Sequence, residues 1–271
     1  MGLEIRRQYE TGRLLNEEPG VYVLEDFLSD TEITSLVEAG NLKLQRALVS
    51  TDASGVVSKG RTGRNCWIPH DHSPTIRSLA KRISQLVELP LCNAESFQLI
   101  HYFQTQKYSA HYDAWEADTE RGKRCMARGG QRLVTCLLYL NDVEKGGGTC
   151  FPKLDLEVAA KRGRMVIFHN CFAGTNVRHP NSLHGGMPVE LGEKWACNLW
   201  FREKSREKEG AKQPKKTSHG QFTKEVARSG KTSHKKGAHR KSARGKGARK
   251  KGIPQKNVSQ NSKTQKRKGF G

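Results

Sequence analysis

The chain has 271 residues and a formal net charge of +21, a length that suits one catalytic domain of about 200 residues with an added segment. The charge is unevenly distributed, because residues 1–202 contain 25 Lys and Arg against 23 Asp and Glu, whereas residues 203–271 contain 23 against 4. The front part is therefore not a basic domain. The seven cysteines are odd in number and form no C-x-x-C pair, which argues against a disulfide framework or a structural zinc site.

The first part of the chain predicts one strand followed by two helices. Residues 20–27 are rich in β-branched and aromatic side chains, which is typical of a strand. Ser29 or Asp30 can cap the helix that follows, whose apolar positions recur three and four residues apart. Glycines indicate a loop at residues 54–57, and a second amphipathic helix is expected at residues 74–89. These helices would support the domain that comes after them.

From about residue 95 the sequence pattern predicts a series of short strands. Because helices come first and many short strands later, we expect an α+β fold with a jelly-roll, or double-stranded β-helix, core. The predicted organisation is a support region at 1–92, a catalytic core at 93–203 and a tail at 204–271. The strands expected in the core are residues 96–103, 131–140, 164–169 and 194–202.

The tail at 204–271 is mostly Lys, Arg, Gly, Ser, Ala and Gln, and its few large apolar residues cannot offset chain entropy, so we expect it to be disordered. Its charge favours nucleic acid or another polyanion as a partner, with a solubilising or targeting role as the alternative. The N-terminus has no apolar stretch that predicts a signal peptide or membrane contact. Buried thiols such as Cys136 and Cys197, in apolar runs, suggest a reducing compartment. We expect a soluble intracellular protein, cytoplasmic or, in a eukaryote, nuclear.

A candidate metal site begins with the sequence KYSAHYDAW, in which His111 and Asp113 form an H-x-D pair. On an extended backbone these two side chains share one face, while Tyr112 points away. A third ligand from a distant strand, His184, would complete two imidazoles and one carboxylate on one side of an ion. This is the facial geometry of non-haem iron(II) oxygenases, which leaves positions open for a co-substrate and O₂. The H-x-D pair alone is weak evidence, since such a tripeptide occurs by chance and an exposed His–Asp pair is the simpler explanation.

Residues 61–202 resemble the catalytic domain of prolyl 4-hydroxylases in five segments that occur in the same order. The segments are RTGRNCWI at 61–68, NAESFQLIHYFQTQKYSAHYDAW at 93–115, GGQRLVTCLLYLNDVEKGGGTCFP at 129–152, RGRMVIFHN at 162–170 and LHGGMPVELGEKWACNLWFRE at 183–203. The resemblance implies a jelly-roll iron(II)- and 2-oxoglutarate-dependent dioxygenase, similar to procollagen-proline 4-dioxygenases. It would hydroxylate C4 of prolyl residues in a peptide or protein and release succinate and CO₂.

The same resemblance implies roles for particular residues. His111, Asp113 and His184 match the iron ligands, and Lys194 matches the residue that binds the distal carboxylate of 2-oxoglutarate, although it could be a solvated surface lysine. A buried carboxylate requires such a cation. Hydroxyl groups that also contact the co-substrate are implied for Tyr102 and Thr149, which could instead be ordinary strand residues. L-Ascorbate is the implied reductant for iron that becomes oxidised in uncoupled cycles.

A peptide groove is implied around three further residues, Tyr108, Arg132 and Trp200. An aromatic wall suits a proline ring, and Arg132 could donate to a substrate carbonyl, whereas Trp200 could equally be a core residue. The segment 115–130, which connects the H-x-D pair to the next strand, is longer and more charged than a compact family member needs. We expect it to be a mobile loop over this groove. Two other functions stay open: the same iron chemistry on a nucleic-acid base or free amino acid, and a non-catalytic nucleic-acid-associated module.

Overall fold

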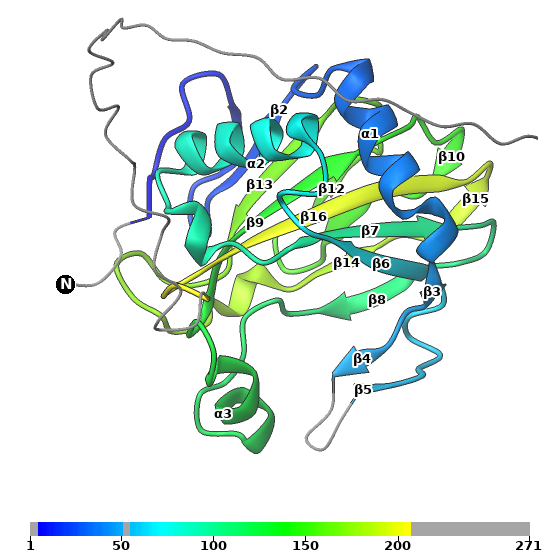
Figure 1. Ribbon diagram of the computed structural model, residues 1–271. Helices are drawn as coiled ribbons and strands as arrows, with labels where there is room; N and C mark the ends of the chain where they lie inside the picture. Colours follow the sequence, from blue (N-terminus) through cyan, green and yellow to red (C-terminus); the bar gives the residue numbers. More distant parts are fainter. Residues whose placement is uncertain (1–4, 51–54, 207–271) are drawn as a thin grey trace, which may run out of the picture. The chain divides into compact units, whose positions relative to one another are not determined.

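A large antiparallel sheet of eight strands forms the centre of the domain. The computed structural model describes residues 5–50 and 55–206 (Figure 1). Four of the eight strands were predicted within the core region, and their bounds agree with the prediction to within one residue at each end. In spatial order the strands are β1 (Arg13–Asn16), β2 (Val21–Leu24), β13 (Met165–His169), β9 (Arg132–Tyr139), β16 (Lys194–Arg202), β7 (Phe97–Tyr102), β6 (Arg64–Ile68) and β3 (Gln45–Arg46).

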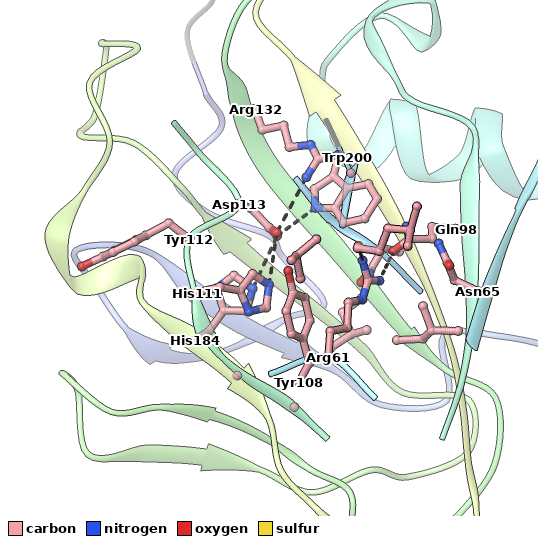
Figure 2. A pocket seen from close by; sticks show the side chains of 18 of the residues that line it. Arg61, Asn65, Gln98, Tyr108, His111, Tyr112, Asp113, Arg132, His184 and Trp200 are labelled. Atoms are coloured by element: carbon pink, nitrogen blue, oxygen red, sulfur yellow. Dashed lines mark hydrogen bonds and ion pairs between the residues drawn. The ribbon is translucent and has the colours of Figure 1, made fainter. Parts of the chain in front are cut away.

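A smaller antiparallel sheet faces the large one, and side chains from both sheets line a cavity (Figure 2). Its strands, in spatial order, are β12 (Leu156–Val158), β11 (Thr149–Phe151), β14 (His184–Gly186) and β8 (Tyr108–His111). Two short ribbons are added, β10 (Lys145–Gly146) with β15 (Val189–Leu191) and β4 (Val49–Ser50) with β5 (Gly55–Val56). The mostly antiparallel sheets with few helices are consistent with the predicted jelly-roll core.

Both helices predicted in the first part of the chain form, and they cover the outer face of the large sheet (Figure 1). In α1 (Asp30–Gly40), Ser29 caps the N-terminus and forms a capping box with Glu32. In α2 (Pro74–Val87), Pro74 occupies the first turn and the helix ends before Glu88, whose φ of 55° is left-handed. The described residues also contain three single-turn 3₁₀ helices, η1 (Asn41–Lys43), η2 (Leu91–Asn93) and η3 (Pro180–Ser182). Within the described residues, no helix is both long and apolar enough to cross a lipid bilayer.

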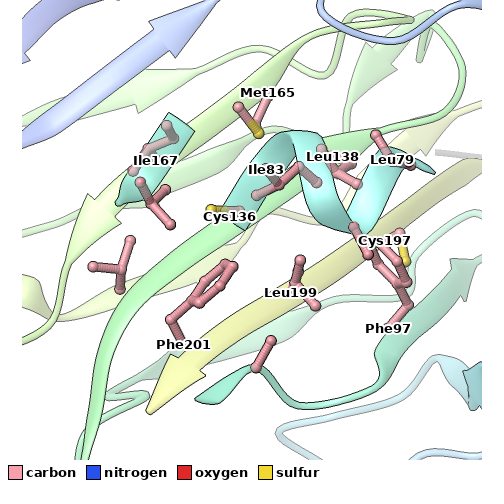
Figure 3. Close-up of a cluster of buried hydrophobic side chains, with 14 of the residues drawn as sticks. Leu79, Ile83, Phe97, Cys136, Leu138, Met165, Ile167, Cys197, Leu199 and Phe201 are labelled. Atoms are coloured by element: carbon pink, nitrogen blue, oxygen red, sulfur yellow. The ribbon is translucent and has the colours of Figure 1, made fainter. Parts of the chain in front are cut away.

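Successive side chains of the central strands point to opposite faces of the large sheet and so belong to two apolar layers. On β16, Cys197 and Leu199 face α2, where they pack with Ile83 (Figure 3). Their neighbour Ala196 belongs to the layer between the two sheets, together with Phe151 of β11. Each fully buried Leu, Ile or Phe contributes about 1.5–3 kcal/mol. The outer layer therefore fixes α2, while the inner layer fixes the small sheet that carries part of the cavity. Cys136 and Cys197 are buried, as predicted from the apolar runs that contain them.

The structure corrects two expectations. The loop predicted at 54–57 includes β5, because pairing with β4 provides backbone hydrogen bonds that the glycine-rich sequence does not indicate. The segment 115–130, predicted as a mobile loop, contains the helix α3 (Glu120–Met126), which is capped by Thr119. The predicted division into a support region, a catalytic core and a tail stays a prediction; β6 and β7, on either side of residue 92, pair within the large sheet. The predicted disorder and polyanion binding concern the tail, which lies outside the described residues after 206.

Candidate active site

One cavity of about 650 Å³ brings together every site residue predicted from the sequence. The residues come from both sheets and from segments almost a hundred positions apart. The cavity volume lies within the range of small-molecule sites, about 300–1,000 Å³. The predicted residues that line it are Tyr102, Tyr108, His111, Asp113, Arg132, Thr149, His184, Lys194 and Trp200.

Strand pairing places the two predicted histidine ligands side by side. β8 and β14 are antiparallel neighbours, and His111 lies directly opposite His184. A Cβ at Gly185 would lie 3.1 Å from the carbonyl oxygen of Tyr108, which is tighter than most Cβ contacts, so this close approach of the strands favours a glycine. Each imidazole holds its Nδ1 against a backbone carbonyl, at 3.0 Å for His111 with Ser109 and 2.9 Å for His184 with Ser182. These contacts favour the tautomer that leaves Nε2 free to bind a metal.

Asp113 lies just beyond the end of β8, and its carboxylate completes the group. Its Oδ1 lies 3.6 Å from Nε2 of His111, and its Oδ2 lies 3.5 Å from Nε2 of His184. The three ligand atoms are within 4.8 Å of one another. Figure 2 shows the three side chains pointing toward one another while Tyr112 points away, as predicted from the H-x-D spacing. The hydroxyl of Tyr112 donates to the carbonyl of Pro180.

Two neighbouring strands of the large sheet hold the Asp113 carboxylate in place. Trp200 Nε1 on β16 and Thr135 Oγ1 on β9 each donate to Oδ2 at 2.8 Å. Trp200 and Thr135 are themselves paired in register across the two strands. The Thr135 hydroxyl in turn accepts from Nδ2 of Asn170 at 2.9 Å. Hydrogen bonds from the large sheet thus fix the aspartate side chain through Oδ2, while its Oδ1 remains directed toward His111.

The protonation states suit metal binding. Burial would raise the pKa of Asp113, but the imidazoles of His184 and His111 and the guanidinium of Arg132 hold it well below its usual range. Burial lowers the pKa of His184 to about 4. An ionised carboxylate and a neutral imidazole are the forms that bind a cation. Two imidazole nitrogens and one carboxylate on one side of a buried site therefore fit iron(II).

Lys194 begins β16 and is 3% exposed in the same cavity. Its Nζ lies 3.5 Å from the carbonyl oxygen of Gly148, and no carboxylate in the described part of the chain forms an ion pair with it. Burial lowers its pKa to about 7. Tyr102 is its partner in register on β7, and Thr149 Oγ1 lies 2.7 Å from the hydroxyl of Tyr139. A buried amine with neighbouring hydroxyl groups is suited to a carboxylate ligand.

Arg132 has a structural role that the sequence did not reveal. Its Nε and Nη2 donate to the two carboxylate oxygens of Glu95 at 2.6 and 2.9 Å, and its Nη1 lies 3.8 Å from Asp113 Oδ1. Its guanidinium carbon lies 3.9 Å from the ring centre of Trp200. Burial would raise the pKa of Glu95, but Arg132, Arg202 and Arg206 lower it to about 2. Arg132 lines the cavity, and its contact with a substrate carbonyl stays a prediction.

Sequence reasoning assigned no role to several residues that shape the site. Arg61 donates to Gln98 Oε1 at 2.9 Å and to the carbonyl of Leu48 at 3.1 Å, and its guanidinium carbon lies 4.6 Å from the ring centre of Tyr108. In the sequence, Arg61 was noted only as the first residue of the segment RTGRNCWI, which resembles the enzyme family. Thr135 occurs within an apolar strand, and Glu95 comes just before another. No local pattern distinguishes these two residues from ordinary strand residues.

Comparisons with known proteins agree with this geometry. Residues 97–202 match the family model of the 2OG-Fe(II) oxygenase superfamily. A putative prolyl 4-hydroxylase of Acanthamoeba polyphaga mimivirus is 34% identical over 183 residues, which cover 68% of this chain and 74% of that protein. Prolyl 4-hydroxylase 2 of Arabidopsis thaliana is 33% identical over 217 residues, covering 72% and 71%.

Solved structures of the same kind are also similar. The viral collagen prolyl hydroxylase of Paramecium bursaria Chlorella virus-1, in its 2OG complex, is 28% identical with a TM-score of 0.54 and covers 67% of this chain and 95% of its own. The prolyl hydroxylase of Trichoplax adhaerens, solved with a hypoxia inducible factor peptide fragment, covers 68% and 84% at 19% identity and a TM-score of 0.51, which supports the fold alone.

Fold and site together define an iron(II)- and 2-oxoglutarate-dependent dioxygenase, an enzyme class that uses O₂ as its oxidant. Within that class, this chain belongs to the prolyl 4-hydroxylase family.

Proposed function

We propose that this protein hydroxylates C4 of prolyl residues in a peptide or protein, with 2-oxoglutarate as co-substrate and L-ascorbate as the reductant that restores iron(II). The observation that carries the proposal is the convergence of two imidazoles, one carboxylate and a buried amine without a carboxylate partner among the described residues. The family relationship supports proline as the target, since the two curated relatives described above are a putative and a named prolyl 4-hydroxylase.

In this proposal, His111, Asp113 and His184 hold iron(II), and Lys194, Tyr102 and Thr149 bind 2-oxoglutarate. When bound, iron(II) with O₂ and 2-oxoglutarate supplies the oxidising chemistry that converts a C–H bond into C–OH, and the co-substrate leaves as succinate and CO₂. The protein contributes position and protection from water.

The chain's own residues orient the reactants. The Ser109 and Ser182 carbonyls keep both Nε2 atoms directed at the metal position, and Trp200 with Thr135 keeps the carboxylate of Asp113 in place. The Lys194 ammonium donates to the distal carboxylate of 2-oxoglutarate, because a buried carboxylate needs a cation.

Aromatic rings beside the metal position form the proposed seat of the proline ring. Tyr108 stacks on His111 with ring centres 3.6 Å apart, and Trp67, which is 47% exposed, lies 5.9 Å from Trp200. Such surfaces offer large, rigid contact area to an apolar ring. The tail's proposed binding to polyanions has its net charge as its only support and concerns residues outside the described part of the chain.

The proposed activity is tested by mass spectrometry of proline-containing peptides incubated with the enzyme, iron(II), 2-oxoglutarate and ascorbate. We expect peptide-dependent release of succinate and the mass of one added oxygen, located on proline by fragmentation. Peptides in which proline is replaced by alanine are the control and should gain no oxygen. Oxygen on a nucleic-acid base or a free amino acid, with none on any prolyl residue, would contradict the proposal.

The pH dependence of 2-oxoglutarate use should report on Lys194. Burial holds its pKa at about 7, so the amine is protonated below this pH and must take up a proton above it to pair with a carboxylate. We therefore expect the KM for 2-oxoglutarate to rise roughly tenfold per pH unit on the alkaline side. Lys194→Arg, whose guanidinium stays protonated, should flatten this rise. A wild-type KM that stays constant across the alkaline range would contradict the role of this amine.

A further inference from the structure

The rim of the cavity carries more positive charge than the proposed reaction needs. Asp113 is the only acidic side chain among the described residues that line the cavity, and it is committed to the metal cluster. Lys194 is accounted for by 2-oxoglutarate, and the donors of Arg132 and Arg61 are largely used within the protein. Among the further cationic side chains that line the same cavity are Lys43, Arg46 and Arg121.

Lys43, Arg46 and Arg121, which we call the rim cations, come from two separate parts of the fold. Lys43 ends η1 and Arg46 lies on β3, whereas Arg121 lies on α3. Figure 1 shows β3 beyond one end of β8 and α3 beyond the other. Because β8 carries His111 at its end, a peptide that crosses the metal position would pass between the two groups.

The charges of these three rim cations are not balanced by carboxylates of the described chain. No carboxylate of the described residues lies within ion-pair distance of Lys43, Arg46 or Arg121. The Nε of Arg121 is buried and has no hydrogen-bond partner among these residues. A buried donor without a partner costs free energy, on the order of 1–3 kcal/mol, until a ligand supplies an acceptor. Arg121 lines the cavity, where an anionic ligand would supply an acceptor.

We propose that the peptide substrate of this enzyme is acidic on both sides of the target proline, with its carboxylates paired to the rim cations. This inference rests on the proposed function and adds its substrate class. Charges of opposite sign on the two surfaces steer encounter and select partners. The aromatic seat beside the metal holds the proline ring, and the rim cations select what flanks it.

The test compares three peptides that share one proline and differ only in the flanking residues. The flanks are Asp and Glu in the first peptide, their neutral isosteres Asn and Gln in the second, and Lys in the third. We expect kcat/KM for proline oxygenation to fall in that order, by roughly tenfold between the acidic and the neutral peptide. The preference should shrink as the salt concentration is raised, because exposed charges are screened.

Two full-length double variants separate the rim cations from the overall charge. Arg46→Glu with Arg121→Glu should abolish or invert the preference for the acidic peptide. Arg77→Glu with Lys81→Glu changes the net charge by the same amount on α2, whose exposed side chains lie on the other side of the large sheet, and should keep the preference. The basic tail is identical in both variants, so its attraction for acidic peptides cancels.

The outcomes are distinct. Equal kcat/KM for acidic and neutral peptides, with oxygen on proline in both, would overturn the substrate class and leave the proposed function intact. An equal loss of preference in the two double variants would also overturn it, since the general field would then be responsible. If no peptide gains oxygen on proline and an oligonucleotide is oxidised instead, the proposed function itself fails.

Discussion

Asp113→Asn is expected to lose iron and to lower succinate formation by at least about a hundredfold, which is the upper end of the effect of residues that merely support metal ligands. The amide keeps the shape of the carboxylate, and its oxygen can still accept from Trp200 and Thr135 at the position of Oδ2. The charge that balances a ferrous ion is lost. The measurements are iron content after anaerobic dialysis and succinate release.

Comparison with Asp113→Ala separates metal binding from stability. The alanine variant removes the buried acceptor of the Trp200 and Thr135 hydrogen bonds. This loss should lower the free energy of unfolding by about 1–3 kcal/mol, and the variant should also be inactive. His111→Ala should lose activity to the same degree as Asp113→Asn, because its Nε2 faces the same metal position. His72→Ala is the control, since this histidine is exposed in a loop. Near-normal turnover in Asp113→Asn or His111→Ala would defeat the ligand assignment.

Lys194→Met is expected to have opposite effects on function and on stability. Truncating one partner of a buried charge pair costs about 2–5 kcal/mol, so kcat/KM for 2-oxoglutarate should fall by roughly a hundredfold or more. Without 2-oxoglutarate, however, the wild-type protein buries an ammonium that has no carboxylate partner in the described chain. Methionine has a similar volume and no charge, so the variant should be more stable than the wild type.

The sign of the stability change depends on pH. The pKa of Lys194 is lowered by burial from 10.5 to about 7 in the folded protein, so folding disfavours its protonated form. The cost of burial is therefore complete below pH 7 and fades as the pH rises toward 10.5. We expect Lys194→Met to raise the free energy of unfolding by on the order of 1–4 kcal/mol at about pH 6, and by little at strongly alkaline pH.

Urea unfolding without and with saturating 2-oxoglutarate measures both effects. The co-substrate should stabilise the wild type and leave Lys194→Met unchanged, because a ligand stabilises only a state that binds it. Lys81→Met, at an exposed position of α2, should change stability by no more than about 0.5 kcal/mol. A Lys194→Met protein that is destabilised at low pH, or that keeps its affinity for 2-oxoglutarate, would contradict the role assigned to this amine.

Local pattern was sufficient for the regular parts of the fold. The capping residues and apolar spacing at Ser29 and in residues 74–89 predicted α1 and α2, and continuous apolar runs predicted the central strands β7, β9, β13 and β16. These elements can be predicted from their own residues, because hydrophobic periodicity and helix capping depend only on residues close together in the sequence. Two- and three-residue strands such as β5 and β12 carry no such pattern, and their backbone pairing depends on partners distant in the sequence.

The sequence by itself determined the chemistry of the site: an H-x-D pair, a distant histidine and a lysine, in segments that resemble one enzyme family. Only the tertiary structure decided how these groups are held. The register of β8 with β14 brings His111 against His184, and Trp200 and Thr135 fix Asp113 from another sheet. The pairing of Arg132 with Glu95 and the placement of Arg121 at the cavity were likewise decided there. The reason is physical, since burial and hydrogen bonding between distant strands depend on the whole packed chain and leave no periodic trace in any one segment.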